Sequence, residues 1–176
     1  MSTHAYLLAR MLDTQSSAGA GPAARVVVSF LRALESFDVD RALTYLGDEI
    51  VYQNYPLPPA RGRVEVERQL RAFSRVASLF QVRMIHVAER DGVVLTERTD
   101  VIRGPGLDLE FWVLGTFEVR DGKIVLWRDR YDTAAVTLQL LTSPLRWLLR
   151  GREHGSAIAS TKGETRRRSP DGDAYV

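Results

Sequence analysis

Two Asp-Gly pairs constrain this chain more than any other feature, because each stands between two segments with the residue alternation of β-strands. The pairs are Asp91-Gly92 and Asp121-Gly122. Asp-Gly is a strong signal for the tight turn that joins antiparallel strands. We therefore predict two β-hairpins in the second half of the sequence. Their strands are expected at Gln81–Glu89, Val93–Arg103, Leu109–Arg120 and Lys123–Tyr131, with a Gly-Pro-Gly turn at 104–106 between the hairpins.

The first half of the sequence has the spacing of helices instead. Pro22 suits the first turn of a helix, and the apolar residues after it are three and four apart, which gives one apolar stripe. Two more helices are expected, the first capped by Asp38, with a strand at Glu49–Asn54 and a proline loop at 55–62 that no regular element should occupy. The stripe consists of Val27, Phe30, Leu31 and Leu34, and the later helices lie at Val39–Leu46 and around Val66, Leu70, Phe73 and Ala77.

Helices followed by a run of strands predict an α+β fold. In this fold a strongly curved sheet, mixed but largely antiparallel, wraps around the N-terminal helices. After the last strand, Thr133–Leu141 is expected to form a short helix. Ser143 is then expected to cap another helix, with Pro144 at its first position.

Length and composition indicate the organisation of the chain. Its 176 residues predict one folded domain, and 45% hydrophobic residues are enough for a core. We expect this domain at 22–149, after a flexible N-terminal extension at 1–21 and before a disordered basic tail at 150–176. The tail is expected to be solvated, with no nucleic-acid partner, and the alternative is contact of the basic C-terminal segment with a membrane surface.

The chain has no cysteine, and its formal net charge is only +2. The lack of cysteine excludes disulfides, zinc–thiolate sites and cysteine nucleophiles. The three histidines, His4, His86 and His154, are too dispersed to predict a metal site. No apolar run approaches the roughly 18 residues of a membrane span, and the first residues lack the pattern of a secretory signal. We therefore expect a soluble cytoplasmic protein.

Three predicted strands carry polar residues two positions apart, which places both members of each pair on one face of the sheet. In the last strand, Asp129 shares its face with Trp127 and Tyr131. An acid between two aromatic rings needs a cation or hydrogen bonds to offset its burial. We expect Arg98 to bridge Asp129 and Asp100, so that the two acids share one proton near neutral pH. The three pairs are Tyr52 and Asn54, Arg98 and Asp100, and Trp127 and Asp129.

The same residues are also compatible with purely structural roles. An Arg–Asp pair on neighbouring strands is commonly a cross-strand ion pair. Tyr52 could be a half-buried strand aromatic, and Asn54 could belong to the turn before the proline loop. The position of Asp129 on an aromatic face, together with polar pairs on two other strands, favours catalysis.

Three segments of the chain resemble the limonene-1,2-epoxide hydrolase family. Residues 52–62 are similar to its Tyr-Gln-Asn-x-Pro-Leu-Pro-Pro stretch, residues 95–101 to its Thr-Glu-Arg-x-Asp-Val strand, and residues 122–132 to its Gly-Lys-Ile…Trp-Arg-Asp-x-aromatic-Asp strand. The resemblance covers residues 22–135 and keeps the order and spacing of the motifs. It implies a cone-shaped fold of the nuclear-transport-factor-2-like or ketosteroid-isomerase-like kind. It also implies a one-step hydrolysis of an epoxide to a diol, without a cofactor.

Carried over position by position, the resemblance implies that Asp129 is the general base for an attacking water held by Tyr52 and Asn54. Asp100 would protonate the epoxide oxygen, with Arg98 between the two acids. The resemblance also implies a lipophilic epoxide of terpene, sterol or fatty-acid type, no metal and a homodimer. The residues expected to line the substrate pocket are apolar or aromatic: Leu31, Leu34, Phe73, Leu79, Ile102, Phe111, Val113, Trp127 and Tyr131.

Two other functions remain open, because one fold hosts many activities. A ketosteroid isomerase or polyketide cyclase would use an Asp to abstract a carbon-bound proton. That chemistry needs an oxyanion hole rather than an arginine between two acids. A non-catalytic domain that binds a small ligand would use the acid pair only as a structural contact.

Overall fold

The chain is described by a computed structural model, and its residues 21–145 are described below. The domain predicted at 22–149 falls almost wholly within this range. Apart from Gly21, the extension predicted at 1–21 and the basic tail predicted at 150–176 lie outside the described residues. Their predicted disorder stays a prediction.

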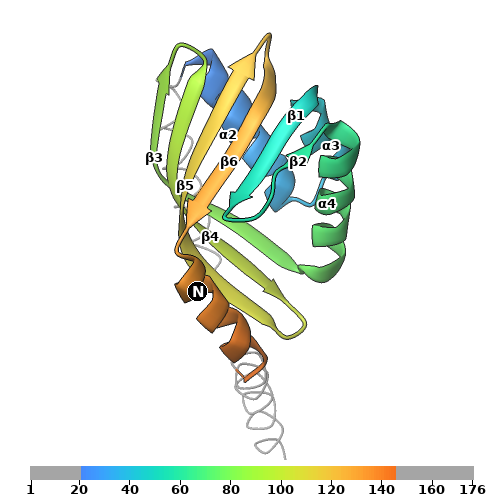
Figure 1. The fold of residues 1–176 in the computed structure, drawn as a ribbon, viewed down its shortest axis with the longest axis vertical. Helices are drawn as coiled ribbons and strands as arrows, with labels where there is room; N and C mark the ends of the chain where they lie inside the picture. Colours follow the sequence, from blue (N-terminus) through green and yellow to red (C-terminus); the bar gives the residue numbers. More distant parts are fainter. Residues whose placement is uncertain (1–20, 146–176) are drawn as a thin grey trace, which may run out of the picture.

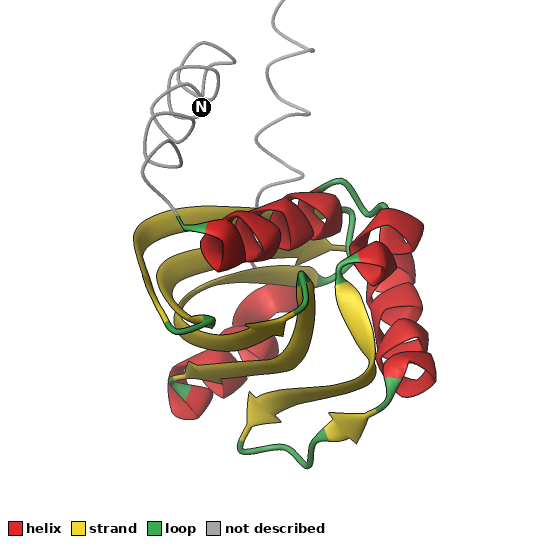
Figure 2. Ribbon diagram, turned by 90° about the horizontal axis from the view of Figure 1, so that it is seen from above, coloured by secondary structure: helices red, strands yellow, loops and turns green. Residues whose placement is uncertain are grey.

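A curved six-stranded sheet dominates the fold, with α2 lying across one of its faces (Figures 1 and 2). We call this the inner face. The strand order is β2-β1-β6-β5-β4-β3, and β1 and β6 are parallel while the other neighbours are antiparallel. The predicted α+β class with a mixed, largely antiparallel sheet is therefore confirmed. The sheet is open, with β2 and β3 at its edges. The elements are α2 (Pro22–Glu35), α3 (Val39–Thr44), β1 (Leu46–Tyr55), β2 (Ala60–Arg61), α4 (Arg63–Val76), β3 (Leu79–Arg90), β4 (Val93–Gly104), β5 (Leu107–Arg120) and β6 (Lys123–Tyr131).

Both predicted hairpins are present. Asp91 and Gly92 have φ of 52° and 77°, and Asp121 and Gly122 have φ of 49° and 72°. Positive φ at both central residues defines the turn whose twist matches that of paired strands. These turns fix the registers of the β3–β4 and β5–β6 pairs, and so decide which side chains reach the inner face.

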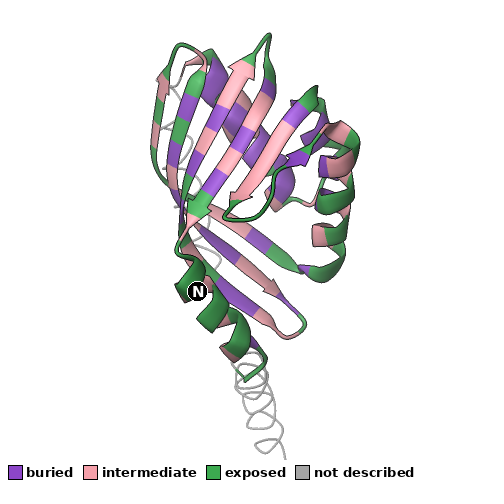
Figure 3. Ribbon diagram, viewed as in Figure 1, coloured by how far each residue is buried: buried purple, intermediate pink, exposed green. Residues whose placement is uncertain are grey.

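The core lies between α2 and the inner face of the sheet. Along much of β4, β5 and β6 buried residues alternate with more exposed ones, as Figure 3 shows. Phe30 of α2 is fully buried, and its ring meets the Trp127 ring edge-on with centroids 5.0 Å apart. Trp127 also stacks on Phe117, with centroids 6.2 Å apart. Burying such rings removes large apolar surfaces from water and anchors α2 to β5 and β6.

Three predicted boundaries are wrong. The helix expected at 39–46 ends at Thr44, because Leu46 already belongs to β1. The proline loop contains the short strand β2, in which Ala60 pairs with Tyr52 of β1. Both β2 residues follow the prolines and keep the N–H groups that a strand needs. Ala77 is extended and ends α4 instead of belonging to its apolar face.

The prediction of two helices after β6 is also wrong. A single helix covers residues 133–145 and is called the C-terminal helix below. Asp132 caps its first turn, accepting a hydrogen bond from the Ala135 N–H at 3.0 Å. Ser143 lies inside the helix, fully buried, where its hydroxyl contacts Asp108 of β5 instead of capping a helix. None of the helices within residues 21–145 has the length and apolar content needed to cross a membrane.

Candidate active site

The candidate site is a row of residues that crosses the inner face of the sheet. Strand register places Thr96 of β4 beside Gly115 of β5, Gly115 beside Asp129 of β6, and Asp129 beside Asn54 of β1. The next row towards the core holds aromatic residues, including Trp127. The row on the other side begins with Arg98, whose neighbour on β5 is Val113. The polar row therefore lies between the packed core and the residues that extend towards the open end of the sheet.

Arg98 is the centre of the site, and only 1% of its surface is exposed. Its Nε donates to Asp100 Oδ1 at 3.0 Å, and its Nη2 donates to Asp129 Oδ2 at 2.7 Å. Its Nη1 donates to Thr96 Oγ1 at 3.0 Å. Each guanidinium nitrogen thus has an acceptor, which a charge at this depth requires. The predicted bridge between the two acids is present.

The two carboxylate oxygens of Asp129 lie in different environments. Oδ2 accepts hydrogen bonds from Arg98 and, at 2.9 Å, from Trp127 Nε1. Oδ1 is buried and has no hydrogen-bond partner among the described residues. Asp129 also lines the cavity described below. One carboxylate oxygen is therefore fixed by the protein, and the other has no hydrogen bond from the described residues.

Tyr52 and Asn54 lie beside this carboxylate because the parallel pairing of β1 with β6 places them there. Asn54 is the strand neighbour of Asp129, and Tyr52 is the neighbour of Trp127. Asn54 Nδ2 donates a hydrogen bond to the Tyr52 hydroxyl oxygen. The Tyr52 ring stacks on Trp127 with centroids 3.9 Å apart. Stacking and hydrogen bonding hold both polar groups at the cavity wall.

Burial controls the protonation of the site. Loss of hydration outweighs the nearby Arg98 charge and raises the pKa of Asp100 to about 6. Burial also raises the pKa of Asp129, although hydrogen bonds from Arg98 and Trp127 oppose this. Burial acts to lower the pKa of Arg98, but the two carboxylates reverse this and raise it. The pKa of Tyr52 is raised by burial and by Asp129, so the phenol keeps its proton.

A cavity of about 340 Å³ opens beside Asp129. Its walls come from the inner face of the sheet, from α2 and α4, and from the C-terminal helix. The polar side chains on its wall include Tyr52, Asn54 and Asp129 of the sheet and Gln69 of α4. The other lining residues are Leu34, Leu70, Phe73, Phe80, Ile102, Leu109, Phe111, Val113, Trp127, Tyr131 and Val136.

Most of the predicted pocket residues line this cavity, but two do not. Leu31 is buried in the core, 2% exposed, on the α2 face that packs against the sheet. Leu79 is 37% exposed at the start of β3, and its neighbour Phe80 lines the cavity instead. Because strand side chains alternate between faces, an error of one residue moves a side chain to the other side of the sheet. Arg98 and Asp100 are the strand neighbours of the lining residues Val113 and Phe111.

A family model for the limonene-1,2-epoxide hydrolase catalytic domain matches residues 21–142. The chain belongs to this family. It is 44% identical over 108 residues to epoxide hydrolase EphG of Mycobacterium tuberculosis (strain ATCC 25618 / H37Rv), an alignment that covers 60% of this chain and 70% of EphG. The comparison supports an epoxide hydrolase, as the sequence motifs predict.

Solved structures agree on the fold. A limonene-epoxide-hydrolase-like epoxide hydrolase from M. tuberculosis matches with a TM-score of 0.67 and 36% identity, over 73% of this chain and 96% of the other. A SnoaL-like polyketide cyclase from Shewanella denitrificans OS-217 matches with a TM-score of 0.64 and 15% identity, over 68% and 97%. At that identity the cyclase shows a shared fold and no shared activity. The expected cone fold is confirmed.

Within residues 21–145 of the hydrolase, no three His, Asp or Glu side chains gather as they would around a metal ion. The acidic groups of the site are instead engaged with Arg98.

Sequence reasoning missed two members of the site. Thr96 lies two residues before Arg98, so strand alternation alone could have placed it on the inner face. Gly115 carries no side-chain signal. A Cβ at Gly115 would overlap with Arg98 Nη1 and Thr96 Oγ1 and would lie 2.9 Å from Phe117 Cε2. The missing side chain is thus what lets the guanidinium cross β5 and reach Asp129.

We expect Gly115→Ala to disable the hydrolase by displacing the Arg98 guanidinium. A displacement of about 1 Å at a catalytic group lowers turnover on the order of 10²-fold. Steady-state kinetics with an epoxide should show this loss in kcat rather than in KM. Gly47→Ala is the control, because a Cβ there meets its nearest neighbour at an ordinary 3.4 Å. Turnover by Gly115→Ala equal to that of Gly47→Ala would contradict the role given to Gly115.

Proposed function

We propose that the hydrolase opens a lipophilic epoxide to a vicinal diol in one step, by direct attack of water. Asp129 takes a proton from the water through Oδ1, and Tyr52 and Asn54 orient that water. Asp100 donates a proton to the epoxide oxygen as the ring opens. The observation that carries this proposal is the Arg98 guanidinium, which contacts both acids within 3.0 Å while one buried oxygen of Asp129 has no hydrogen bond from the described residues.

Charge balance supports different roles for the two acids. One guanidinium between two ionised carboxylates leaves a net charge of −1 in a buried site, and one bound proton removes it. Asp129 accepts hydrogen bonds from Arg98 and Trp127, which favours its ionised form. Asp100 accepts a hydrogen bond from Arg98 and its pKa is raised to about 6, so we assign it the shared proton below that pH. General acid and base groups each contribute about 10²–10⁴-fold to rate.

The cavity supports a compact, apolar substrate. Its volume of about 340 Å³ is at the lower end of the range of about 300–1,000 Å³ that is usual for small-molecule sites. Aliphatic and aromatic residues form most of the wall. Such a cavity favours a terpene-sized epoxide, or the epoxide end of a fatty acid, over a complete sterol.

Two further expectations from the sequence belong to this proposal. A homodimer is supported by the outer face of the sheet, where large apolar side chains are exposed. The mass in solution, measured by light scattering, decides between dimer and monomer. The exposed apolar side chains on this face are Ile85, Leu95, Trp112 and Leu114. The second expectation, a cytoplasmic location, stays a prediction.

Asp129→Asn and Asp100→Asn should each abolish at least ~99% of diol formation, because each removes one proton transfer. Both variants keep the size of the side chain, so circular dichroism should show a folded protein. Glu97→Gln is the control, because Glu97 lies on the outer face in contact with His86. Turnover within a few-fold of wild type in either Asp variant would refute the role assigned to that residue.

A single turnover in ¹⁸O-labelled water tests the one-step mechanism. With enzyme in excess over the epoxide, direct attack places the label in the diol during the first turnover. An attack by an enzyme carboxylate would instead place an unlabelled enzyme oxygen in that diol. Mass spectrometry of the product distinguishes the two, and an unlabelled first-turnover diol would exclude the proposed mechanism.

The activity should fall on the alkaline side as Asp100 loses its proton. Its pKa is raised from 3.8 to about 6, so the group is protonated below this pH and ionised above it. We expect kcat/KM to fall about tenfold per pH unit well above that pKa. Folding stability should also decrease as pH rises between these two values, since the folded chain binds this proton more tightly. A kcat/KM that stays flat from about pH 5 to pH 8 would contradict a shared proton on Asp100.

A further inference from the structure

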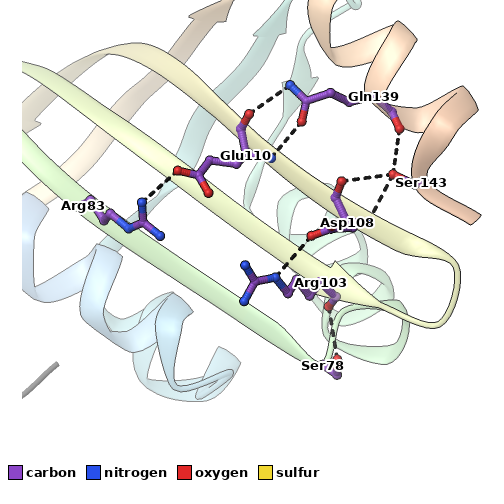
Figure 4. Close-up of polar contacts among 7 residues, drawn as sticks. All are labelled: Ser78, Arg83, Arg103, Asp108, Glu110, Gln139 and Ser143. Carbon is purple, nitrogen blue, oxygen red and sulfur yellow. Dashed lines mark hydrogen bonds and ion pairs between the residues drawn. The ribbon is translucent and has the colours of Figure 1, made fainter. Parts of the chain in front are cut away.

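The C-terminal helix is joined to β5 by two side chains that hydrogen-bond to the strand backbone (Figure 4). Gln139 Oε1 accepts from the Glu110 N–H at 2.9 Å, and Gln139 Nε2 donates to the Glu110 carbonyl at 2.9 Å. The Asp108 N–H donates to the Ser143 hydroxyl at 3.2 Å, and this hydroxyl lies 3.1 Å from the Asp108 carbonyl oxygen and 2.7 Å from the Gln139 carbonyl oxygen of its own helix. We call this set of contacts the helix clamp.

The clamp continues the pairing of β5 beyond the end of β6. The β5–β6 ladder begins at Val113, paired with Tyr131, after which the chain turns into the C-terminal helix. Four helical residues rise about 6 Å and two strand residues about 7 Å. Gln139 and Ser143 therefore match the spacing of Glu110 and Asp108. A helix face takes the place that a strand would otherwise occupy.

On the other side of this stretch, ion pairs join β5 to its neighbour β4 and, beyond it, to β3, as Figure 4 also shows. Glu110 pairs with Arg83 of β3 at 2.8 Å, and Asp108 pairs with Arg103 of β4 at 3.2 Å. The stretch of β5 is thus held by the sheet on one side and by the helix on the other. The position of the helix then depends on the clamp.

Apolar packing contributes little to holding this helix. Leu138, Leu141 and Leu145 are 64%, 76% and 61% exposed. They lie on the side of the helix opposite Gln139 and Ser143, as their spacing along the chain requires. The face turned towards the domain carries Val136 together with Gln139 and Ser143. Hydrogen bonds rather than buried leucines therefore set the distance between helix and strand.

The same helix and strand form one wall of the substrate cavity. Val136, one turn before Gln139, lines the cavity, and so do Leu109 and Phe111, which alternate with the clamped residues of β5. We propose that Gln139 and Ser143 are positioning residues that fix this wall and thereby set which epoxides fit the cavity. The substrate class rests on the proposed function, whereas the clamp itself does not.

The test uses the full chain with Gln139→Met, Ser143→Ala and the double variant. Thr142→Ala is the control, because the Thr142 hydroxyl bonds only to carbonyls of its own helix, at Leu138 and Gln139. Hydrogen exchange followed by NMR reports the clamp directly. The amides of Glu110 and Asp108 should exchange at least ~10-fold faster in the double variant than in the control, because their acceptors are removed.

Kinetics with cyclohexene oxide and the bulkier 1-phenylcyclohexene oxide report the cavity wall. Loosening the wall should raise KM for the smaller epoxide and shift the kcat/KM ratio about 5-fold or more towards the larger one. The alkaline limb of the pH profile should not move, since the acid pair is untouched. A shifted limb with an unchanged ratio would refute a role in selectivity.

The two readouts separate failure of this inference from failure of the proposed function. Unchanged amide exchange in the double variant would overturn the clamp, whatever the enzyme does to epoxides. If wild type hydrolysed neither epoxide, the proposed function would fail. The wall would then be tested by displacing an apolar fluorescent dye with cyclohexanol and 1-phenylcyclohexanol. If each alcohol displaced the dye equally well from the double variant and from Thr142→Ala, the inference would be overturned.

Discussion

The buried guanidinium of Arg98 is the interaction on which the site depends. A charge that is 1% exposed carries a large desolvation cost, and two carboxylates and a hydroxyl offset it. The carboxylates are equally dependent on the guanidinium, since burial alone would neutralise both. The three charged groups are therefore stable only together. The proposed mechanism places one proton on this group, beside the carboxylate that it uses as the base.

The contacts of Arg98 with Asp100 and Asp129 can form only when the strands of the sheet pair in the observed register. Asp129 has Gly115 on one side and Asn54 on the other, and the first strand of the chain reaches it by parallel pairing with the last. Gly115 leaves the space through which Arg98 crosses β5. The aromatic row beside it, with Trp127 stacked on Tyr52, fixes Asp129 from the side of the core. Packing of the core and orientation of the base are thus one arrangement.

Local patterns predicted much of this, because strand alternation and Asp-Gly turns act over a few residues. They placed Arg98, Asp100 and Asp129 on one face. They could not identify Gly115, whose role exists only after two antiparallel turns have set β4, β5 and β6 side by side. The prediction that Ser143 caps a helix is wrong for a related reason. Its sequence has the signal of a helix cap, and contact with the distant β5 backbone outweighs that local signal.

Different parts of this molecule determine the catalytic chemistry and the substrate selectivity. The acid pair depends on a buried charge network within the sheet. The far wall of the cavity, with Val136 and Phe111, depends on side chains of a helix that replace a strand. Hydrogen bonds of that kind contribute about 1 kcal/mol each, far less than a buried ion-pair network loses when one partner is removed. Substitutions at the helix can therefore reshape the cavity without disturbing the protonation of the acids, so one catalytic arrangement can serve different epoxides.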